Sequence, residues 1–245
     1  MEGHLKYCLF DANVIAAYYC PRTTRSQQVV KKSRIVIESV RSGASKHFFY
    51  IPNFCIAEVF SVFMKYAYSN WNRHTTPGCI DKRVYRSLRD QFQDDIHNAK
   101  LFYHYELSRY HILAVNLVAP IDHYFKLSRK TAGSNPTTPS GTFDQLLIAM
   151  GLHLVKLHGV GNVVIVTADD RLARVVGKCR EQLKPATKQK LRLPDAAKLT
   201  GIQFQPESFP SVLNLKTATK TQLKEVFGEW PMTIKSKYKR PYLAK

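Results

Sequence analysis

Short apolar runs alternate with longer amphipathic stretches along most of the chain. The run Tyr7-Cys8-Leu9-Phe10 stops at a polar Asp-Ala-Asn, which predicts a buried strand at Tyr7–Phe10. Residues 48–51 and 162–167 are similar apolar runs and predict two further strands, and residues 113–118 are another candidate. Gln27–Arg41 carries its apolar residues at helical spacing between basic ones, so it predicts an amphipathic helix.

The segments between the predicted strands favour helices and polar loops. Pro52 and Asn53 open a helix expected to run through Glu58 to about residue 66, because proline is tolerated in the first turn. The other predicted elements are a polar loop at 69–78, a long charged helix at 81–110, a helix starting at Pro120, a mobile loop at 131–141, a helix from its N-cap Thr142 to residue 158, and a helix opened by Asp169.

This alternation predicts the fold class and the domain organisation. Strands that alternate with helices are typical of a three-layer α/β/α sandwich around a mostly parallel sheet. The pattern weakens towards the C-terminus, where residues 201–204 are the last expected strand. We therefore expect one α/β domain over residues 1–205, with an insertion over residues 66–112, followed by a basic extension over residues 206–245.

Composition narrows the partners and the compartment. The chain has 37 Lys and Arg against 18 Asp and Glu, a formal net charge of +19, which favours a polyanionic partner such as nucleic acid. The cysteines are five, an odd number, without a C-x-x-C pair, so a reducing compartment such as the cytoplasm is expected. The N-terminal region does not resemble a signal peptide, because Asp11 and Asn13 interrupt it, and no run approaches the roughly 18 apolar residues of a membrane span.

Acidic residues are scarce, and four of them fall where the chain is expected to bring them together. Asp11 directly follows the first strand, and Asp169 lies two residues beyond the strand at 162–167. Glu58 and Asp144 lie in the first turns of predicted helices. In open α/β sheets such positions meet at the carboxyl ends of the strands. Asp144 or Asp169 alone could be an ordinary helix cap, whereas Asp11 and Glu58 interrupt apolar sequence and need a partner.

Clustered carboxylates repel one another unless a cation holds them. Oxygen ligands select hard ions, so the expected cofactor is Mg²⁺ or Mn²⁺ rather than zinc. In a basic protein such a site predicts hydrolysis of phosphodiester bonds, because a bound dication activates water and neutralises developing charge.

The motifs around these acids resemble those of the PIN-domain nucleases over about residues 6–205. The matching motifs are Leu9-Phe10-Asp11-Ala12-Asn13-Val14, Ile51-Pro52 with Ala57-Glu58-Val59, Phe143-Asp144-Gln145-Leu146-Leu147-Ile148-Ala149, and Val164-Ile165-Val166-Thr167-Ala168-Asp169. The resemblance implies a parallel α/β/α fold and a Mg²⁺- or Mn²⁺-dependent endoribonuclease with Asp11, Glu58, Asp144 and Asp169 as the catalytic, metal-binding acids. Asn13 and Thr167 match positions that support the site by hydrogen bonding.

The same resemblance suggests partners. Many PIN-domain proteins are toxins of toxin–antitoxin modules, so RNA and an antitoxin protein are the expected partners, and a homo-oligomer is possible. The chain departs from the compact toxins in the long stretch between Glu58 and Asp144 and in its basic extension, which weakens the toxin assignment but not the catalytic one.

Two alternatives to a nuclease stay open. One is an RNA-binding PIN-like module with weak or absent catalysis, which the surplus of Lys and Arg would serve equally well. The other is a small-molecule phosphatase of the haloacid-dehalogenase type, which needs a second Asp where this chain has Asn13.

The residues that follow Asp169 give weaker signals. Asp170 could share the metal role, but the T-x-D register favours Asp169 and makes Asp170 a helix-start residue. The basic residues beyond it either contact RNA phosphates or form an ordinary solvated face. These residues are Arg171, Arg174, Lys178 and Arg180, and a further basic cluster occupies residues 235–240.

Overall fold

A parallel sheet of five strands forms the centre of the computed structural model, which describes residues 5–20, 26–43, 45–71, 82–97, 101–131, 140–202 and 204–232. The strand order is β3-β2-β1-β4-β5, and every neighbouring pair is parallel. The strands are β1 (Tyr7–Phe10), β2 (Phe48–Pro52), β3 (Tyr103–Tyr105), β4 (Val163–Thr167) and β5 (Ser211–Asn214). The order reverses direction at β1, where the chain moves from the β2–β3 side to the β4–β5 side. This point is where ligand sites form in open α/β sheets.

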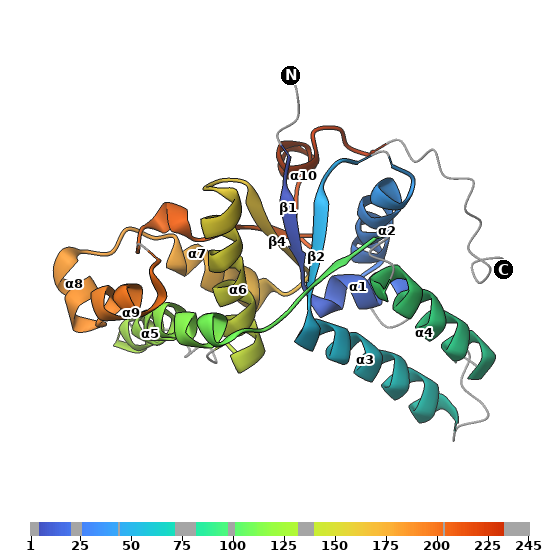
Figure 1. Ribbon diagram of the computed structural model, residues 1–245, viewed down its shortest axis with the longest axis horizontal. Helices are drawn as coiled ribbons and strands as arrows, with labels where there is room; N and C mark the ends of the chain where they lie inside the picture. The colour runs from blue at the N-terminus through green and yellow to red at the C-terminus, as the bar shows by residue number, and fades with distance from the viewer. Residues whose placement is uncertain are drawn as a thin grey trace.

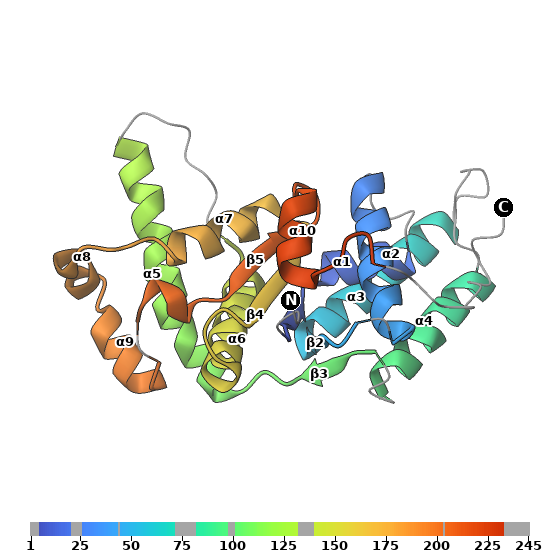
Figure 2. The same cartoon turned by 90° about the horizontal axis from the view of Figure 1, so that it is seen from above.

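Helices cover both faces of the sheet, which confirms the predicted α/β/α sandwich (Figures 1 and 2). One layer contains α1 (Ala12–Tyr19), α2 (Gln27–Arg41), α3 (Asn53–Trp71) and α4 (Lys82–His97). The other contains α5 (Arg109–Thr131), α6 (Thr142–His158), α7 (Asp170–Cys179), α8 (Pro185–Lys190) and α9 (Leu193–Thr200). A 3₁₀ turn (Pro206–Ser208) precedes β5, and α10 (Lys220–Phe227) follows it.

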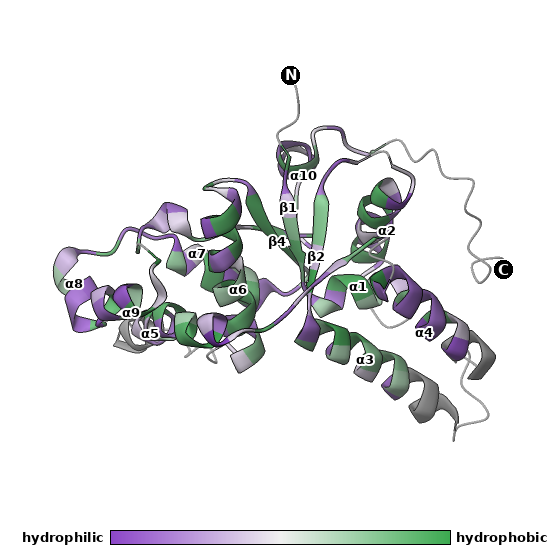
Figure 3. Ribbon diagram, viewed as in Figure 1, coloured by the Kyte–Doolittle hydropathy of each residue, from purple (hydrophilic) through white to green (hydrophobic). Residues whose placement is uncertain are grey.

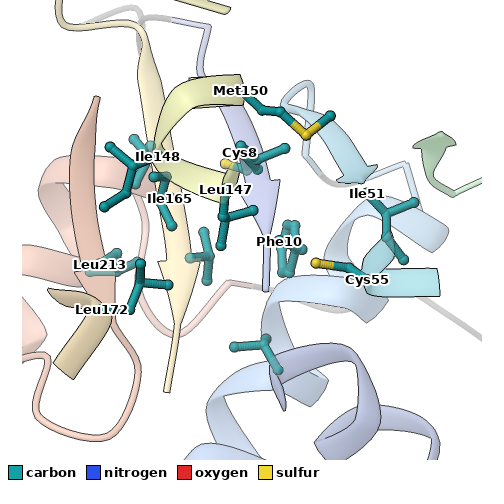
Figure 4. Packing of buried hydrophobic residues seen from close by; sticks show 14 of the residues in the cluster. Cys8, Phe10, Ile51, Cys55, Leu147, Ile148, Met150, Ile165, Leu172 and Leu213 are labelled. Carbon is teal, nitrogen blue, oxygen red and sulfur yellow. The ribbon is translucent and has the colours of Figure 1, made fainter. Parts of the chain in front are cut away.

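The apolar runs of the sequence become the core because the central strands are covered on both faces. All five residues of β4 are buried, and so are Cys8, Leu9 and Phe10 of β1. Side chains from α3, α6 and α7 pack against them, including Cys55, Leu147 and Leu172 (Figure 4). The central strands β1, β2 and β4 and the inner helices α1, α3 and α6 are mostly hydrophobic, whereas α4 and α8 are hydrophilic (Figure 3). Among the described residues, none of the helices combines the length and the apolar character needed to cross a membrane.

A buried ion pair holds Ser140 in place. Lys178 on α7 donates to Asp122 on α5 at 3.0 Å, and both side chains are almost fully buried. Asp122 also accepts from the backbone N–H and the hydroxyl of Ser140, each at 2.9 Å. Ser140 lies two residues before α6, so these bonds anchor the backbone next to the start of that helix.

Several predicted elements are wrong in the first half of the chain. Residues 113–118 are not a strand but part of α5, in which Ala114, Leu117, Val118 and Ile121 are buried at helical spacing. Pro120 lies inside that helix rather than at its start. The charged helix expected at 81–110 ends at His97, and β3 follows it. The short helix α1 was not predicted.

The loop and cap predictions have mixed outcomes. Residues 69–71, where a loop was expected to begin, belong to α3, which continues to Trp71. The rest of that loop, most of the loop at 131–141 and the basic cluster at 235–240 lie outside the described residues. The N-cap of α6 is Gly141 and not Thr142, which is the first helical residue.

The C-terminal region contributes to the sheet. The strand expected at 201–204 is wrong, since the described residues there adopt no strand. The last strand is β5, which comes from the region expected to be an extension and pairs with β4 from Val164↔Ser211 to Thr167↔Asn214. Beyond it, Leu215, Leu223 and Phe227 are buried in the same core.

Candidate functional site

The carboxyl ends of β1 and β4 bring two of the predicted acids together. The two strands pair in register up to Phe10↔Val166, and the backbone N–H of Asp11 donates to the carbonyl of Val166 at 3.0 Å. Asp11 is the N-cap of α1, and Asp169 is the N-cap of α7. Each acid therefore lies where its strand ends and the next helix begins.

Hydrogen bonds of Thr167 and Asn13 connect the turn after β1 with the turn after β4. The Thr167 hydroxyl donates to Oδ2 of Asp11 at 2.6 Å and accepts from the backbone N–H of Asp169 at 2.9 Å. The Asn13 amide donates to the same Asp11 oxygen at 2.6 Å and accepts from the backbone N–H of Ala168 at 2.9 Å. Both residues thus lie where the sequence motif places supporting groups, and together they fix the orientation of the Asp11 carboxylate.

The helix α3 brings Glu58 and Cys55 to the same place. A carboxylate oxygen of Asp11, one of Glu58 and the sulfur of Cys55 all lie within 4.8 Å of one another. Cys55 is buried, and this burial together with the nearby negative charges of Asp11 and Glu58 raises the pKa of its thiol well above the usual value. Without a cation the thiol therefore keeps its proton, and Cys55 packs in the hydrophobic core beside the acids.

Asp144 enters the site from the first turn of α6. Its Oδ2 accepts from the backbone N–H of Gly141 at 3.1 Å, which caps the helix. The same oxygen accepts from the Arg171 guanidinium at 2.9 Å. The carboxylate therefore acts as both a cap and an ion-pair partner, and neither of these bonds uses Oδ1.

All four predicted acids line one cavity of about 330 Å³. Its wall contains acidic, polar and apolar side chains, which come from β1 and α1, from α3, from α6 and from the turn into α7. The lining residues are Asp11, Ala12, Asn13, Phe54, Cys55, Glu58, Val62, Phe143, Asp144, Leu147, Asp169 and Arg171. Asp11, Glu58 and Asp169 follow the carboxyl ends of β1, β2 and β4, and these ends lie at the lower end of the sheet in Figure 1, where α1 and α3 start.

The electrostatics of the cavity follow from this crowding. Burial is the largest cause that raises the pKa of Asp11 from 3.8 to about 7; the charges of Glu58, Asp144 and Asp169 contribute to the rise, and the Thr167 hydrogen bond opposes it. Burial and the charge of Asp144 also raise the pKa of Glu58. Removing a like charge or adding a cation would relieve this repulsion.

The donor set fits a hard dication. Carboxylate oxygens are the ligands that Mg²⁺ and Mn²⁺ prefer, and three of the acids have no basic side chain bonded to them among the described contacts. Asp144 is the exception because of Arg171, whose side chain is 39 % exposed. The Asp144 side chain is only 20 % exposed, so the pair is half-buried; it lowers the local negative charge and leaves Oδ1 of Asp144 out of the contact.

The other residues singled out in the sequence lie elsewhere. Asp170 accepts from Asn214 at 2.8 Å and from Lys216 at 2.5 Å, so it anchors the turn after β5 and does not line the cavity. Lys178 is buried against Asp122 and faces the core, which makes the solvated RNA contact considered for it incompatible with its position. Arg174 and Arg180 are exposed and donate to the carbonyls of Asp170 and Phe209.

The cavity residues that were not predicted from the sequence include Cys55, Phe54 and Phe143. Cys55 precedes Glu58 by three positions, and a helix brings such residues to one face, so the spacing could have revealed it. Phe54 and Phe143 look like core residues in the sequence, yet Phe143 is 52 % exposed at the cavity. The presence of a phenylalanine in the sequence does not show whether its ring is buried in the core or lines a site.

No protein-family model matches the sequence, and no curated protein is significantly similar to it. The functional assignment therefore depends on the cavity and on the motifs that the chain itself carries.

Proposed function

We propose that the chain is a Mg²⁺- or Mn²⁺-dependent nuclease that cleaves RNA at the cavity lined by Asp11, Glu58, Asp144 and Asp169. The observation that carries this proposal is that four carboxylates from four separate chain segments line one cavity. They do so in a chain with a formal net charge of +19. A negative pocket within a positive protein suits a cation in the pocket and a polyanion around it.

The residues of the chain would divide the work as follows. Asp11, Glu58 and Asp169 would hold the dication, with Asp144 as a fourth ligand through its second oxygen. When bound, the dication would activate water and neutralise charge on the phosphate. Thr167 and Asn13 would keep the Asp11 oxygen in place through their bonds of 2.6 Å. Arg171 would lie beside the phosphate and exchange its bond to Asp144 for one to the substrate.

The choice of RNA depends on the likeness of the four motifs to PIN-domain nucleases. The same likeness proposes an antitoxin-like protein as a regulatory partner and a cytoplasmic location. A second candidate function is an RNA-binding module without catalysis, and the observation that favours it is the Arg171–Asp144 ion pair, which partly neutralises one of the acids.

Cleavage of defined RNAs tests the proposal. Single-stranded and structured RNAs would be incubated with the purified chain and Mn²⁺ or Mg²⁺, and in parallel with a chelator. Asp11→Asn and Asp144→Asn should lose cleavage by at least about a hundredfold, as expected when a metal ligand is removed. Asp195→Asn, at an exposed aspartate outside the cavity, is the matched control and should cleave normally.

Two results would reject this assignment. If Asp11→Asn cleaved as fast as the parent, the carboxylates would have no catalytic role. If the parent bound RNA but did not cleave it with either ion, the binding-module function would replace the nuclease. Hydrolysis of small phosphoesters without cleavage of RNA would instead indicate a phosphatase.

A further inference from the structure

Two aromatic rings form a stacked pair at the edge of the carboxylate cavity. Phe54 is the second residue of α3, and Phe143 is the second residue of α6. Their ring centroids are 5.4 Å apart and their planes differ by 14°. The first turns of the two helices are therefore joined by an aromatic contact beside the proposed metal site.

Phe143 is unusual because its ring is exposed at the cavity, where a ligand could contact it. It is 52 % exposed, whereas core rings such as Phe10, Phe49 and Phe63 are at most 1 % exposed. Of the exposed large apolar side chains among the described residues, only Phe143 lines this cavity. An apolar ring kept in contact with water next to a polar site is a common sign of binding.

The lining of the cavity is chemically mixed. Carboxylates and Arg171 lie next to the apolar side chains of Phe54, Phe143, Val62 and Leu147. Phe143 also directly precedes Asp144, so the ring and the acid start from adjacent backbone positions. A ligand that fits this lining needs a charged group that a cation can bridge to the carboxylates and, beside it, a flat apolar group.

A nucleotide has this composition. Its phosphate suits the carboxylates once a dication is bound, and its base has a flat face that stacks on phenylalanine. At about 330 Å³ the cavity is near the lower end of the range for small-molecule sites, roughly 300–1,000 Å³, so it suits one nucleotide and not a duplex. Bases inside a duplex already stack on each other and do not offer a free face.

We infer that Phe143, supported by Phe54, is a stacking platform for an unpaired base adjacent to the phosphate held at the carboxylates. This inference rests on the proposed nuclease function and adds a base-contacting residue to the proposed site. A protein segment with an apolar side chain is the competing occupant. The strong positive charge of the chain and the phosphate-compatible lining favour the nucleotide.

Binding of a fluorescent RNA tests the platform separately from cleavage. Asp11→Asn would serve as the background, since it is expected not to cleave, and Mn²⁺ would be added in excess because this variant is expected to bind the cation more weakly. The probe is a single-stranded RNA with one 2-aminopurine, whose fluorescence falls when it stacks on an aromatic ring. Phe143→Ala and Phe143→Trp would be added to this background, with Leu199→Ala as the control, because Leu199 is 65 % exposed and does not line the cavity.

The expected results are specific to the ring. Phe143→Ala should weaken binding by roughly 5- to 150-fold and abolish the quenching, because stacking of one base is worth about that factor. Phe143→Trp should retain both, and Leu199→Ala should change neither. The same RNA annealed to its complement should bind without any dependence on residue 143. With Asp11 intact and Mn²⁺ present, Phe143→Ala should lower kcat/KM on single strands by a similar factor.

The two proposals can fail separately. Equal RNA affinity and equal quenching in the phenylalanine and alanine proteins would overturn the platform and assign the ring to a protein contact, even if the chain cleaves RNA. Quenching that depends on Phe143 in a chain that never cleaves would support the platform and reject the nuclease. Equal cleavage of single strands and duplexes by the parent would overturn the inference that an unpaired base stacks on Phe143.

Discussion

Replacing Asp11 with asparagine should stabilise the metal-free protein at neutral and alkaline pH, although it removes a proposed metal ligand. Oδ2 of Asp11 accepts hydrogen bonds of 2.6 Å from Thr167 and from Asn13. The Oδ1 of an asparagine can accept both of these bonds. The substitution therefore keeps the shape and the hydrogen bonds, and it removes only the charge that burial and the neighbouring acids disfavour.

The magnitude follows from the pKa. A rise from 3.8 to about 7 corresponds to about 4 kcal/mol, at about 1.36 kcal/mol for each pH unit. Since the folded pKa lies above the unfolded one, the folded protein holds the proton more tightly, and stability is lost as the pH rises from about 4 to about 7. Asp11 is only partly buried, so solvent reduces the expected gain for Asp11→Asn to about 2–4 kcal/mol above about pH 7. Below about pH 4 the gain should vanish.

Urea unfolding of both proteins across this pH range measures the effect, with a chelator present. The quantity to compare is the difference between the two free energies of unfolding at each pH, because other groups cancel in it. One such group is His111. Burial and the neighbouring His153 lower its pKa to about 4, so His111 makes the folded protein more stable as the pH rises through this range, which is opposite to the effect of Asp11. The free energy of unfolding of the parent alone could therefore change little with pH, because the two effects oppose each other.

Addition of Mn²⁺ completes the test. The ion should stabilise the parent in proportion to its binding and should stabilise Asp11→Asn much less. A difference that stays near zero at about pH 8 would show that the acids do not repel one another as their positions require. An equal Mn²⁺ effect on both proteins would place the cation elsewhere.

Three further predictions concern the rest of the site and the fold. Thr167→Val removes the hydroxyl that donates to Asp11 and lowers its pKa. We expect it to lower the free energy of unfolding by about 1–3 kcal/mol and to weaken Mn²⁺ affinity, measured by titration, about tenfold or more. Unchanged Mn²⁺ affinity would contradict the supporting role of Thr167. RNA affinity, measured by filter binding, should fall steeply between low and physiological salt because of the net charge of +19, and a flat salt dependence would contradict the electrostatic argument. Truncation after residue 205 should prevent stable folding, because it removes β5 and buried side chains such as Leu213 and Phe227, each worth about 2–5 kcal/mol; a truncated chain with native circular dichroism and a cooperative melt would contradict this.

The sequence predicts the elements whose hydrophobic period is unambiguous. β1, β4 and α2 match their patterns, because continuous apolar runs and helical spacing each have one reading there. The stretch from Leu113 to Val118 does not, since a short apolar run suits a buried helix as well as a strand. β3 and β5 were missed because edge strands are short and carry polar residues such as His104 and Asn214.

Residues of the candidate site could be predicted from the sequence where a charged side chain interrupts an apolar segment, because burying an unpaired charge is unfavourable. A carboxylate such as Asp11 or Glu58 in an apolar segment needs a compensating partner, and both line the cavity. Contacts between distant segments could not be predicted in this way. The pairing of Arg171 with Asp144 and the burial of Lys178 against Asp122 depend on how α5, α6 and α7 pack, and no local pattern records that.

The start of α6 connects the two proposals physically. Asp122, held by Lys178, fixes Ser140, and Gly141 then caps the helix with the Asp144 carboxylate. The ring of Phe143 and the acid of Asp144 are thereby presented from neighbouring positions of one rigid turn. A shift of that turn by one residue would rotate both side chains by about 100° around the helix axis. The acid would leave the proposed metal ligands, and the ring would leave the proposed base platform. Cation binding and base stacking therefore share one structural support, which consists of a buried ion pair that touches neither ligand.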